Sequence, residues 1–302
     1  MRWRGRRMSD NVEDQTGSGG GMGFPMGGGR LPIGGKGGMG CGGLVIVIVL
    51  ALVFGVDPMQ LLGGLSQQGG VAVPTQQQAP SATPGEGQGC ERSDLHRFSC
   101  TVLADTEDTW NAIFKQSGQD YPEPTLVFYA GLGQSGCGTA QSATGPFYCP
   151  ADHKIYIDTS FFDQLENQLG AGGDFAQAYV IAHEVGHHIQ TITGLSNELR
   201  QQQARVGKAE GNALQVRMEL QADCYAGLWA RSNQEHLEAG DIEEALTAAN
   251  AIGDDRLQRQ SQGYVVPDSF THGTSAQRMA WFKRGYETGD PNQCDTFSAR
   301  EL

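Results

Sequence analysis

The sequence predicts an α+β domain over residues 90–302, dominated by helices and holding a small sheet, behind one N-terminal transmembrane helix. Three observations support this prediction. Residues 37–56 carry no charge, two short segments are rich in aromatic and β-branched residues, and the chain after Gly173 has helical periodicity almost to its end. Of the 44 glycines, 24 lie in residues 1–90, so the glycine excess belongs to the segment before the domain.

The N-terminal part is typical of a membrane-anchored protein. Residues 1–36 form a glycine-rich basic tail, residues 37–56 can span a bilayer as a helix, and residues 57–89 form a flexible linker. No Lys or Arg follows the apolar segment until Arg92, whereas four basic residues open the chain: Arg2, Arg4, Arg6 and Arg7. The positive-inside rule therefore predicts a single-pass inner-membrane protein with a cytoplasmic N-terminus and a periplasmic or otherwise extracytoplasmic domain.

Two other interpretations of residues 37–56 were weighed. A cleaved signal peptide is disfavoured, because about 40 residues precede the apolar centre and no Ala-x-Ala pattern follows it. A buried core helix is disfavoured by the glycine-rich flanks. The glycine-rich residues 8–40 are expected to be disordered.

Cysteine usage agrees with export. Six of the 7 cysteines lie in the predicted external part: Cys90, Cys100, Cys137, Cys149, Cys224 and Cys294. An even number in an oxidising compartment suggests disulfides. Proximity in the sequence favours Cys90–Cys100 and Cys137–Cys149, which leaves Cys224–Cys294, and buried free thiols are the alternative.

The charge of the domain argues against one class of partner. Residues 91–302 carry 15 Lys and Arg against 29 Asp and Glu, a net charge of −14. Such an acidic body repels phosphate backbones, so we expect no nucleic-acid partner.

The elements of the domain follow from local patterns. Asp105–Gly118 is predicted to be a helix capped at Asp105 or Thr106, and two strands are predicted at Thr125–Ala130 and Lys154–Asp158. Four helical segments follow, at Asp174–Thr193, Glu198–Ser232 with a break near 207–211, Asp241–Gln260 and Thr274–Thr288. The last two begin with capping-box spacing, Asp241 with Glu244 and Thr274 with Gln277.

The first long helix carries the sequence His183-Glu184-Val185-Gly186-His187. Residues four apart share one face of a helix, so both imidazoles can point at one ion, and imidazole nitrogen is a common zinc ligand. Glu184 is offset by one position, which suits a general base that acts on water at the metal. His188 lies on another side of the helix, where a supporting or surface role is expected.

A catalytic zinc needs a third protein ligand. Glu219 is the best candidate, and Asp223, four residues later on the same helix face, can accept the free N–H of a ligand histidine. The alternative is an ordinary acidic pair on a surface helix, but apolar residues surround this pair. Asp152-His153 is a weaker ligand candidate, for which a turn is the preferred interpretation.

These motifs resemble those of the putative neutral zinc metallopeptidases, a family of single-pass bacterial membrane proteins. The resemblance covers roughly residues 90–295 and rests on four segments in order: 148–152, 183–188, 219–224 and 269–278. It implies a zincin-like fold of the gluzincin type, with one Zn²⁺ held by His183, His187 and Glu219. It says little about the substrate.

The last of these segments contains His272 and Arg278. In related gluzincins a histidine or arginine near the C-terminal end assists the transition state, and the resemblance suggests that role for both residues. Packing at the N-terminus of a helix is the alternative for His272, and pairing with a local carboxylate is the alternative for Arg278.

We therefore expect a membrane-anchored zinc peptidase that cleaves a peptide or protein substrate, with Glu184 as general base. Lys154–Asp158 is a candidate edge strand on which an extended peptide can pair. The competing hypothesis is a non-catalytic tethered zinc module that binds a protein partner. A structural zinc needs a fourth ligand, and Cys224 points away from the Glu219 face.

Overall fold

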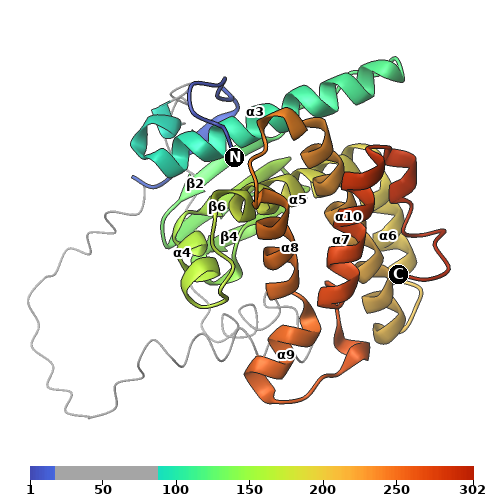
Figure 1. Cartoon of the computed structure of the whole chain (residues 1–302). Coiled ribbons are helices and arrows are strands. Elements are labelled where there is room, and N and C mark those ends of the chain that lie inside the picture. Colours follow the sequence, from blue (N-terminus) through green and yellow to red (C-terminus); the bar gives the residue numbers. More distant parts are fainter. Residues whose placement is uncertain (18–87) are drawn as a thin grey trace, which may run out of the picture.

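The computed structural model describes residues 1–17 and 88–302, in which a small sheet lies beside a group of packed helices (Figure 1). The sheet has four strands in the order β1–β2–β6–β5, formed by Val12–Asp14, Thr125–Tyr129, Lys154–Asp158 and Phe147–Cys149. β1 and β6 run parallel to β2, whereas β5 runs antiparallel to β6. β3 (Leu132–Ser135) and β4 (Gly138–Gln141) form a separate hairpin. The helix-dominated α+β prediction is confirmed.

Both predicted strands are present, but β6 lies inside the sheet, between β2 and β5. The proposal that Lys154–Asp158 offers a free edge is therefore wrong. The edge next to β6 belongs to β5, a three-residue strand that the sequence analysis did not predict, because its aromatic residues stand in a turn-rich stretch.

The α-helices of the described residues are α3 (Asp94–Gln116), α4 (Ser160–Asn167), α5 (Asp174–Ile192), α6 (Leu195–Gln203), α7 (Lys208–Ser232), α8 (Asp241–Ala251), α9 (Asp254–Gln262) and α10 (Ser275–Thr288). The break near 207–211 separates α6 from α7, and the capping box of Thr274 with Gln277 opens α10. α4 was not predicted.

Two predicted helices have different bounds. α3 begins at Asp94, because the Ser93 hydroxyl caps it by accepting from the His96 N–H. The hydroxyls of Ser99 and Thr101 bond to carbonyls one turn back and so stay within the helix. The segment predicted as one helix over Asp241–Gln260 is divided into α8 and α9. It breaks at Gly253, where a Cβ atom would lie 2.3 Å from the Ser275 nitrogen at the start of α10.

α5 lies at the centre of the helical layer and packs against α3, α7 and α8. Most of its apolar residues are buried in the main core, and Phe175, Tyr179 and Ile181 are fully buried. The core includes side chains from β2 and β6, so the sheet covers one flank of α5 while α7 and α10 stand on another (Figure 1). This burial fixes the orientation of the helix that carries both histidines.

Residues 1–17 are part of this domain. β1 extends the sheet, and the α-amino group of Met1 lies 3.1 Å from both Asp174 and Asp241, the first residues of α5 and α8. Asp241 is therefore engaged by the N-terminus instead of capping α8, whose N-cap is Gly240. The predicted disorder of residues 8–40 does not hold for residues 8–17.

No helix within the described residues is both long and apolar enough to cross a bilayer. The anchor predicted at residues 37–56 and most of the linker predicted at 57–89 lie outside them.

Three disulfides join Cys90 to Cys100, Cys137 to Cys149 and Cys224 to Cys294. These are the pairs favoured by sequence proximity. The third closes a separation of 70 residues and ties the end of the chain to the middle of α7.

Candidate metal centre

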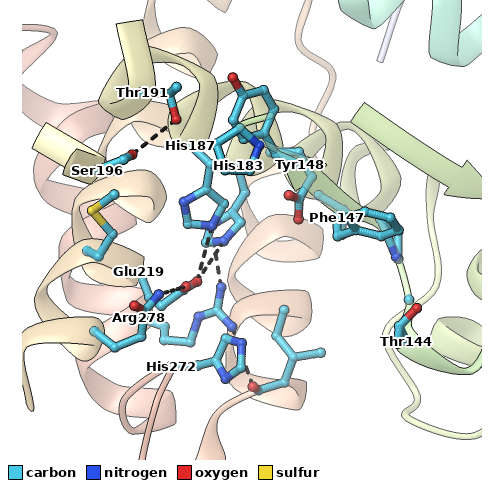
Figure 2. Close-up of a pocket in the computed structure, with 18 of the residues that line it drawn as sticks. Thr144, Phe147, Tyr148, His183, His187, Thr191, Ser196, Glu219, His272 and Arg278 are labelled. Atoms are coloured by element: carbon cyan, nitrogen blue, oxygen red, sulfur yellow. Dashed lines mark hydrogen bonds and ion pairs between the residues drawn. The ribbon is translucent and has the colours of Figure 1, made fainter. Parts of the chain in front are cut away.

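α5 and α7 bring the three predicted ligands together (Figure 2). Oε2 of Glu219 lies 3.2 Å from Nε2 of His183 and 3.3 Å from Nε2 of His187. One ligand atom from each residue falls within 4.8 Å of the others. Two imidazole nitrogens and a carboxylate oxygen are a donor set that Zn²⁺ accepts, so the residues present fit the metal.

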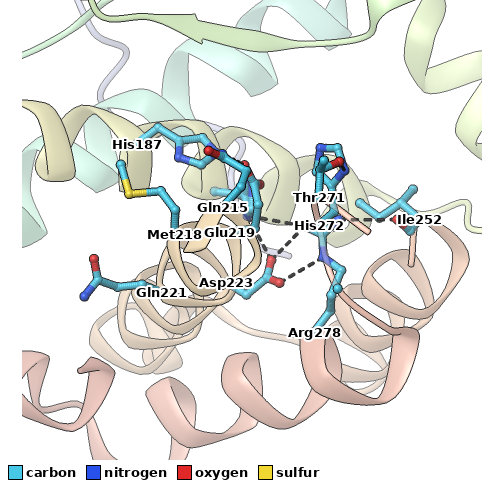
Figure 3. A network of polar contacts seen from close by, with 12 residues as sticks. His187, Gln215, Met218, Glu219, Gln221, Asp223, Ile252, Thr271, His272 and Arg278 are labelled. Atoms are coloured by element: carbon cyan, nitrogen blue, oxygen red, sulfur yellow. Dashed lines mark hydrogen bonds and ion pairs between the residues drawn. The ribbon is translucent and has the colours of Figure 1, made fainter. Parts of the chain in front are cut away.

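Asp223 fixes the orientation of His183. Its Oδ1 accepts a hydrogen bond from Nδ1 of His183 at 2.8 Å, which leaves Nε2 free to face the site. The same carboxylate accepts from the Tyr179 hydroxyl at 2.5 Å. It also accepts from Nε and Nη2 of Arg278, both at 2.9 Å (Figure 3). Burial raises the pKa of Asp223, but the positive charges of Arg278 and His183 outweigh it and lower the pKa to about 2.

An amide fixes the orientation of His187. Nε2 of Gln190 donates to the Met218 carbonyl at 2.7 Å and to Oε1 of Gln221 at 3.1 Å. Because both N–H groups are used, Oε1 of Gln190 is the acceptor for Nδ1–H of His187, at 2.9 Å. Nε2 of His187 is therefore free for the metal, as in His183.

The two oxygens of Glu219 have different partners. Nε2 of Gln215 donates to Oε1 at 2.9 Å, while Oε2 faces the two histidines. Burial raises the pKa of Glu219, but His187 and other cationic neighbours outweigh it and hold the pKa well below its ordinary value. The carboxylate is thus ionised and offers one oxygen to a cation.

Glu184 lies in the same cavity but outside the ligand set. The cavity has a volume of about 510 Å³ and is lined by α5, α6, α7, the segment 144–150 and His272. Burial raises the pKa of Glu184, opposed by the charges of His187 and His183. A carboxyl whose pKa is raised toward neutrality is suited to taking up and releasing a proton.

His272 lies on the loop before α10, at the wall of the cavity (Figure 2). Oδ2 of Asp254 accepts the backbone N–H groups of residues 271, 272 and 273 at 2.7, 2.7 and 3.1 Å, and Oδ1 lies 3.4 Å from Nδ1 of His272. Partial burial lowers the pKa of His272, but the carboxylates of Glu219 and Asp254 outweigh it and raise the pKa. The loop therefore presents a protonatable donor beside the ligands.

Arg278 lies on α10 and is among the residues that line the cavity. It is 2 % exposed, and its guanidinium is held by Asp223 and by the Tyr179 hydroxyl, 3.1 Å away. Pairing with a local carboxylate, the alternative weighed for this residue, describes what the structure shows. Nη2 of Arg278 also lies 3.5 Å from Nδ1 of His183, so the role suggested for Arg278 at the transition state stays a prediction.

His188 is fully buried. Nε2 lies 2.6 Å from the Pro122 carbonyl and Nδ1 lies 3.1 Å from the Tyr148 hydroxyl, so the residue links α5 to the edge strand β5. Asp152 and His153 lie in the turn between β5 and β6, where Asp152 accepts from the Gly136 N–H and the Tyr156 hydroxyl.

The sequence analysis missed four supporting residues: Tyr179, Gln190, Gln215 and Asp254. Helical spacing was an available signal for three of them. Tyr179 and Gln215 stand four residues before His183 and Glu219, and Gln190 stands three residues after His187. Asp254 gave no local signal, because its loop partners are 17 to 19 residues away in the sequence.

Comparisons with known proteins agree with this geometry. The chain is 54 % identical over 301 residues to the uncharacterized protein YpfJ of Escherichia coli K12, covering 98 % of this chain and 99 % of that protein. It is 44 % identical over 267 residues to the uncharacterized protein Rv2575 of Mycobacterium tuberculosis H37Rv, covering 83 % and 86 %. No solved structure matches the chain. The model of one family, described as putative neutral zinc metallopeptidase, matches residues 1–297, and the chain belongs to that family.

Proposed function

We propose that the protein is a zinc-dependent peptidase that hydrolyses peptide bonds with Glu184 as general base. The observation that carries the proposal is the arrangement of two histidines and one carboxylate on a cavity that also holds a separate, buried carboxyl group. Cys224, the residue considered as a closing ligand for a structural zinc, is bonded to Cys294. A three-ligand set with a free carboxyl beside it is typical of a catalytic centre.

The residues divide the chemistry among them. His183, His187 and Glu219 would hold Zn²⁺, which when bound polarises water and the substrate carbonyl. Glu184 removes the proton from the attacking water and returns it to the leaving amine. His272, held by Asp254, donates a hydrogen bond to the oxygen on which negative charge develops. Asp223 and Gln190 keep the two imidazoles oriented throughout.

The edge strand supports an extended peptide as substrate. β5 pairs with β6 on one side only, and Phe147 and Tyr148 of this strand line the cavity opposite the ligand helices (Figure 2). Within the described residues β5 is an outer strand of the sheet, and its unpaired edge can accept a peptide laid along the cavity, with the Tyr148 N–H already bonded to Glu184. We therefore expect the substrate peptide to pair with β5, and not with β6 as the sequence analysis proposed.

Three disulfides support a location outside the cytoplasm, where oxidising conditions preserve them. We keep residues 37–56 as the proposed membrane attachment, on the basis of their composition alone.

The test is Glu184→Gln in the full-length chain, with zinc content and peptide hydrolysis measured on the same preparation. We expect zinc to be retained and the rate to fall by about 10²–10⁴, the usual contribution of a general base. Glu198→Gln, an exposed residue of α6, serves as the matched control and should leave both unchanged. An unchanged rate in Glu184→Gln would refute the role of this residue. Zinc without hydrolysis in the parent chain would favour the non-catalytic module.

A further inference from the structure

Two buried carboxylates in the middle of α3 obtain their partners from the N-terminal segment, residues 1–17. Asp105 is 3 % exposed and lies 2.6 Å from Nη2 of Arg6. Glu107 is 1 % exposed and accepts from Arg7 and Asn11, both at 2.9 Å, and from the Ser9 hydroxyl. The ion pairs that the described residues form with these two carboxyl groups come from Arg6 and Arg7 of the segment. Burial raises the pKa of Asp105 to about 7 and the charge of Arg6 opposes this shift, so the segment supplies the cationic partner of a buried carboxyl group.

Backbone pairing joins the same segment to the domain at two further places. Val12, Glu13 and Asp14 pair in parallel with Leu126, Val127 and Phe128, which makes the segment the outer strand of the sheet. The Ser9 N–H donates to the Cys100 carbonyl at 3.0 Å, next to the Cys90–Cys100 disulfide. The side chain of Val12 is 4 % exposed, within the main core. The segment is therefore an integral part of the fold.

This packing bears on the membrane orientation that was inferred from the basic residues at the N-terminus. The positive-inside argument treated Arg6 and Arg7 as free cytoplasmic charges. In the structure both arginines are paired with carboxylates of α3, as is Arg4 with Asp94 at 2.9 Å. Charges neutralised within a folded domain are a poor guide to orientation. A single crossing between residues 17 and 88 would place these partners on opposite sides of the membrane.

We propose that residues 1–17 and 88–302 fold together on the same, oxidising side of the membrane, so that the N-terminal segment is a strand of the domain and not a cytoplasmic tail. The three disulfides assign the side, and the buried pairs of Asp105 and Glu107 assign the segment to it. This proposal is independent of peptidase activity and replaces the single-pass topology expected from residues 37–56.

Cysteine labelling in cells tests the proposal directly. In the full-length chain with Cys41→Ser, the exposed positions Asp10 and Glu243 are changed singly to Cys. Cells with a permeabilised outer membrane are treated with a membrane-impermeant maleimide, and lysed cells supply the total for each variant. We expect Asp10→Cys and Glu243→Cys to label to the same extent before lysis. Labelling of Asp10→Cys only after lysis would overturn the proposal, and so would protection of both positions.

A stability measurement distinguishes a structural segment from a sorting signal. The purified full-length variant Arg6→Met/Arg7→Met should unfold at a lower urea concentration than the parent and lose protease resistance. Arg300→Met removes an exposed arginine from the other end of the chain and should leave the unfolding midpoint unchanged. An unchanged midpoint in the double variant would show that the two arginines do not support the fold.

Discussion

Gly186 and Ala222 lie at the crossing point of the two helices that carry the candidate metal ligands. A Cβ atom on Gly186 would lie 2.9 Å from the Cα atom of Ala222, closer than real Cβ atoms approach a backbone. Gly186 stands between Glu184 and His187 on α5, and Ala222 stands between Glu219 and Asp223 on α7. The close approach therefore sets the distance between the histidines and the carboxylate.

Gly186→Ala should push the two helices apart. We expect a lower zinc affinity and a loss of about 1–3 kcal/mol in the free energy of unfolding, as for other overpacked sites. Zinc titration and urea denaturation measure the two effects. Gly211→Ala is the matched control, because it lies in α7 with its nearest neighbour 3.9 Å from the added Cβ atom. It should be neutral or stabilising by about 0.5–1 kcal/mol. Equal behaviour of the two variants would contradict this account of the helix crossing.

Zinc binding should release protons near neutral pH. Burial alone would lower the pKa of His187, but Glu219 and Glu184 outweigh it and raise the pKa to about 9. Below that pH the metal-free protein holds a proton on His187, which the metal must displace, so zinc affinity should rise with pH until about 9. Calorimetry in buffers of different ionisation enthalpy measures the number of protons released. A pH-independent affinity between pH 6 and 8 would show that His187 is neutral before zinc binds.

Removing the partner of a buried charge tests the role of Arg278. Arg278→Met leaves the carboxylate of Asp223 without its guanidinium, and we expect a loss of about 3–5 kcal/mol in the free energy of unfolding. Lys283→Met removes an exposed cation from the same helix and should have little effect. If Arg278 instead acted only on the transition state, Arg278→Met would keep its stability and its zinc while losing activity.

The sequence predicted which side chains share a helix face at the candidate metal site, because helical spacing is local information. His183 with His187, and Glu219 with Asp223, are each four residues apart, so each pair shares a helix face wherever the helix lies. The crossing that joins the pairs depends on Gly186 and Ala222, which a single sequence does not identify as neighbours. Glu219 was associated with the histidines by its spacing to Asp223 among apolar residues, and the resemblance to a zinc family supported that choice.

The parts that were not predicted depend on contacts between distant residues. Arg6 and Asp105 are 99 residues apart, and the β1–β2 pairing joins residues 12–14 to residues 126–128. A strand of three residues is too short for its sequence to indicate which strand it pairs with. The arginines likewise carry no local pattern that indicates their partners on α3. For the same reason the sequence analysis could place β6 but could not tell that β5 covers its outer side.

The loop that holds His272 gives a final test, one that separates positioning from binding. Asp254→Asn removes the negative charge facing Nδ1 of His272 and weakens the acceptor for three backbone N–H groups. Because neither residue is a ligand, zinc content should stay at the level of the parent chain. If His272 donates to the developing oxyanion, we expect kcat to fall by about 10-fold or more while KM changes little, and His272→Ala should lower kcat similarly. The double variant should then be no slower than the slower single variant, because both changes remove the same donor. Additive losses would show that Asp254 acts by some route other than His272.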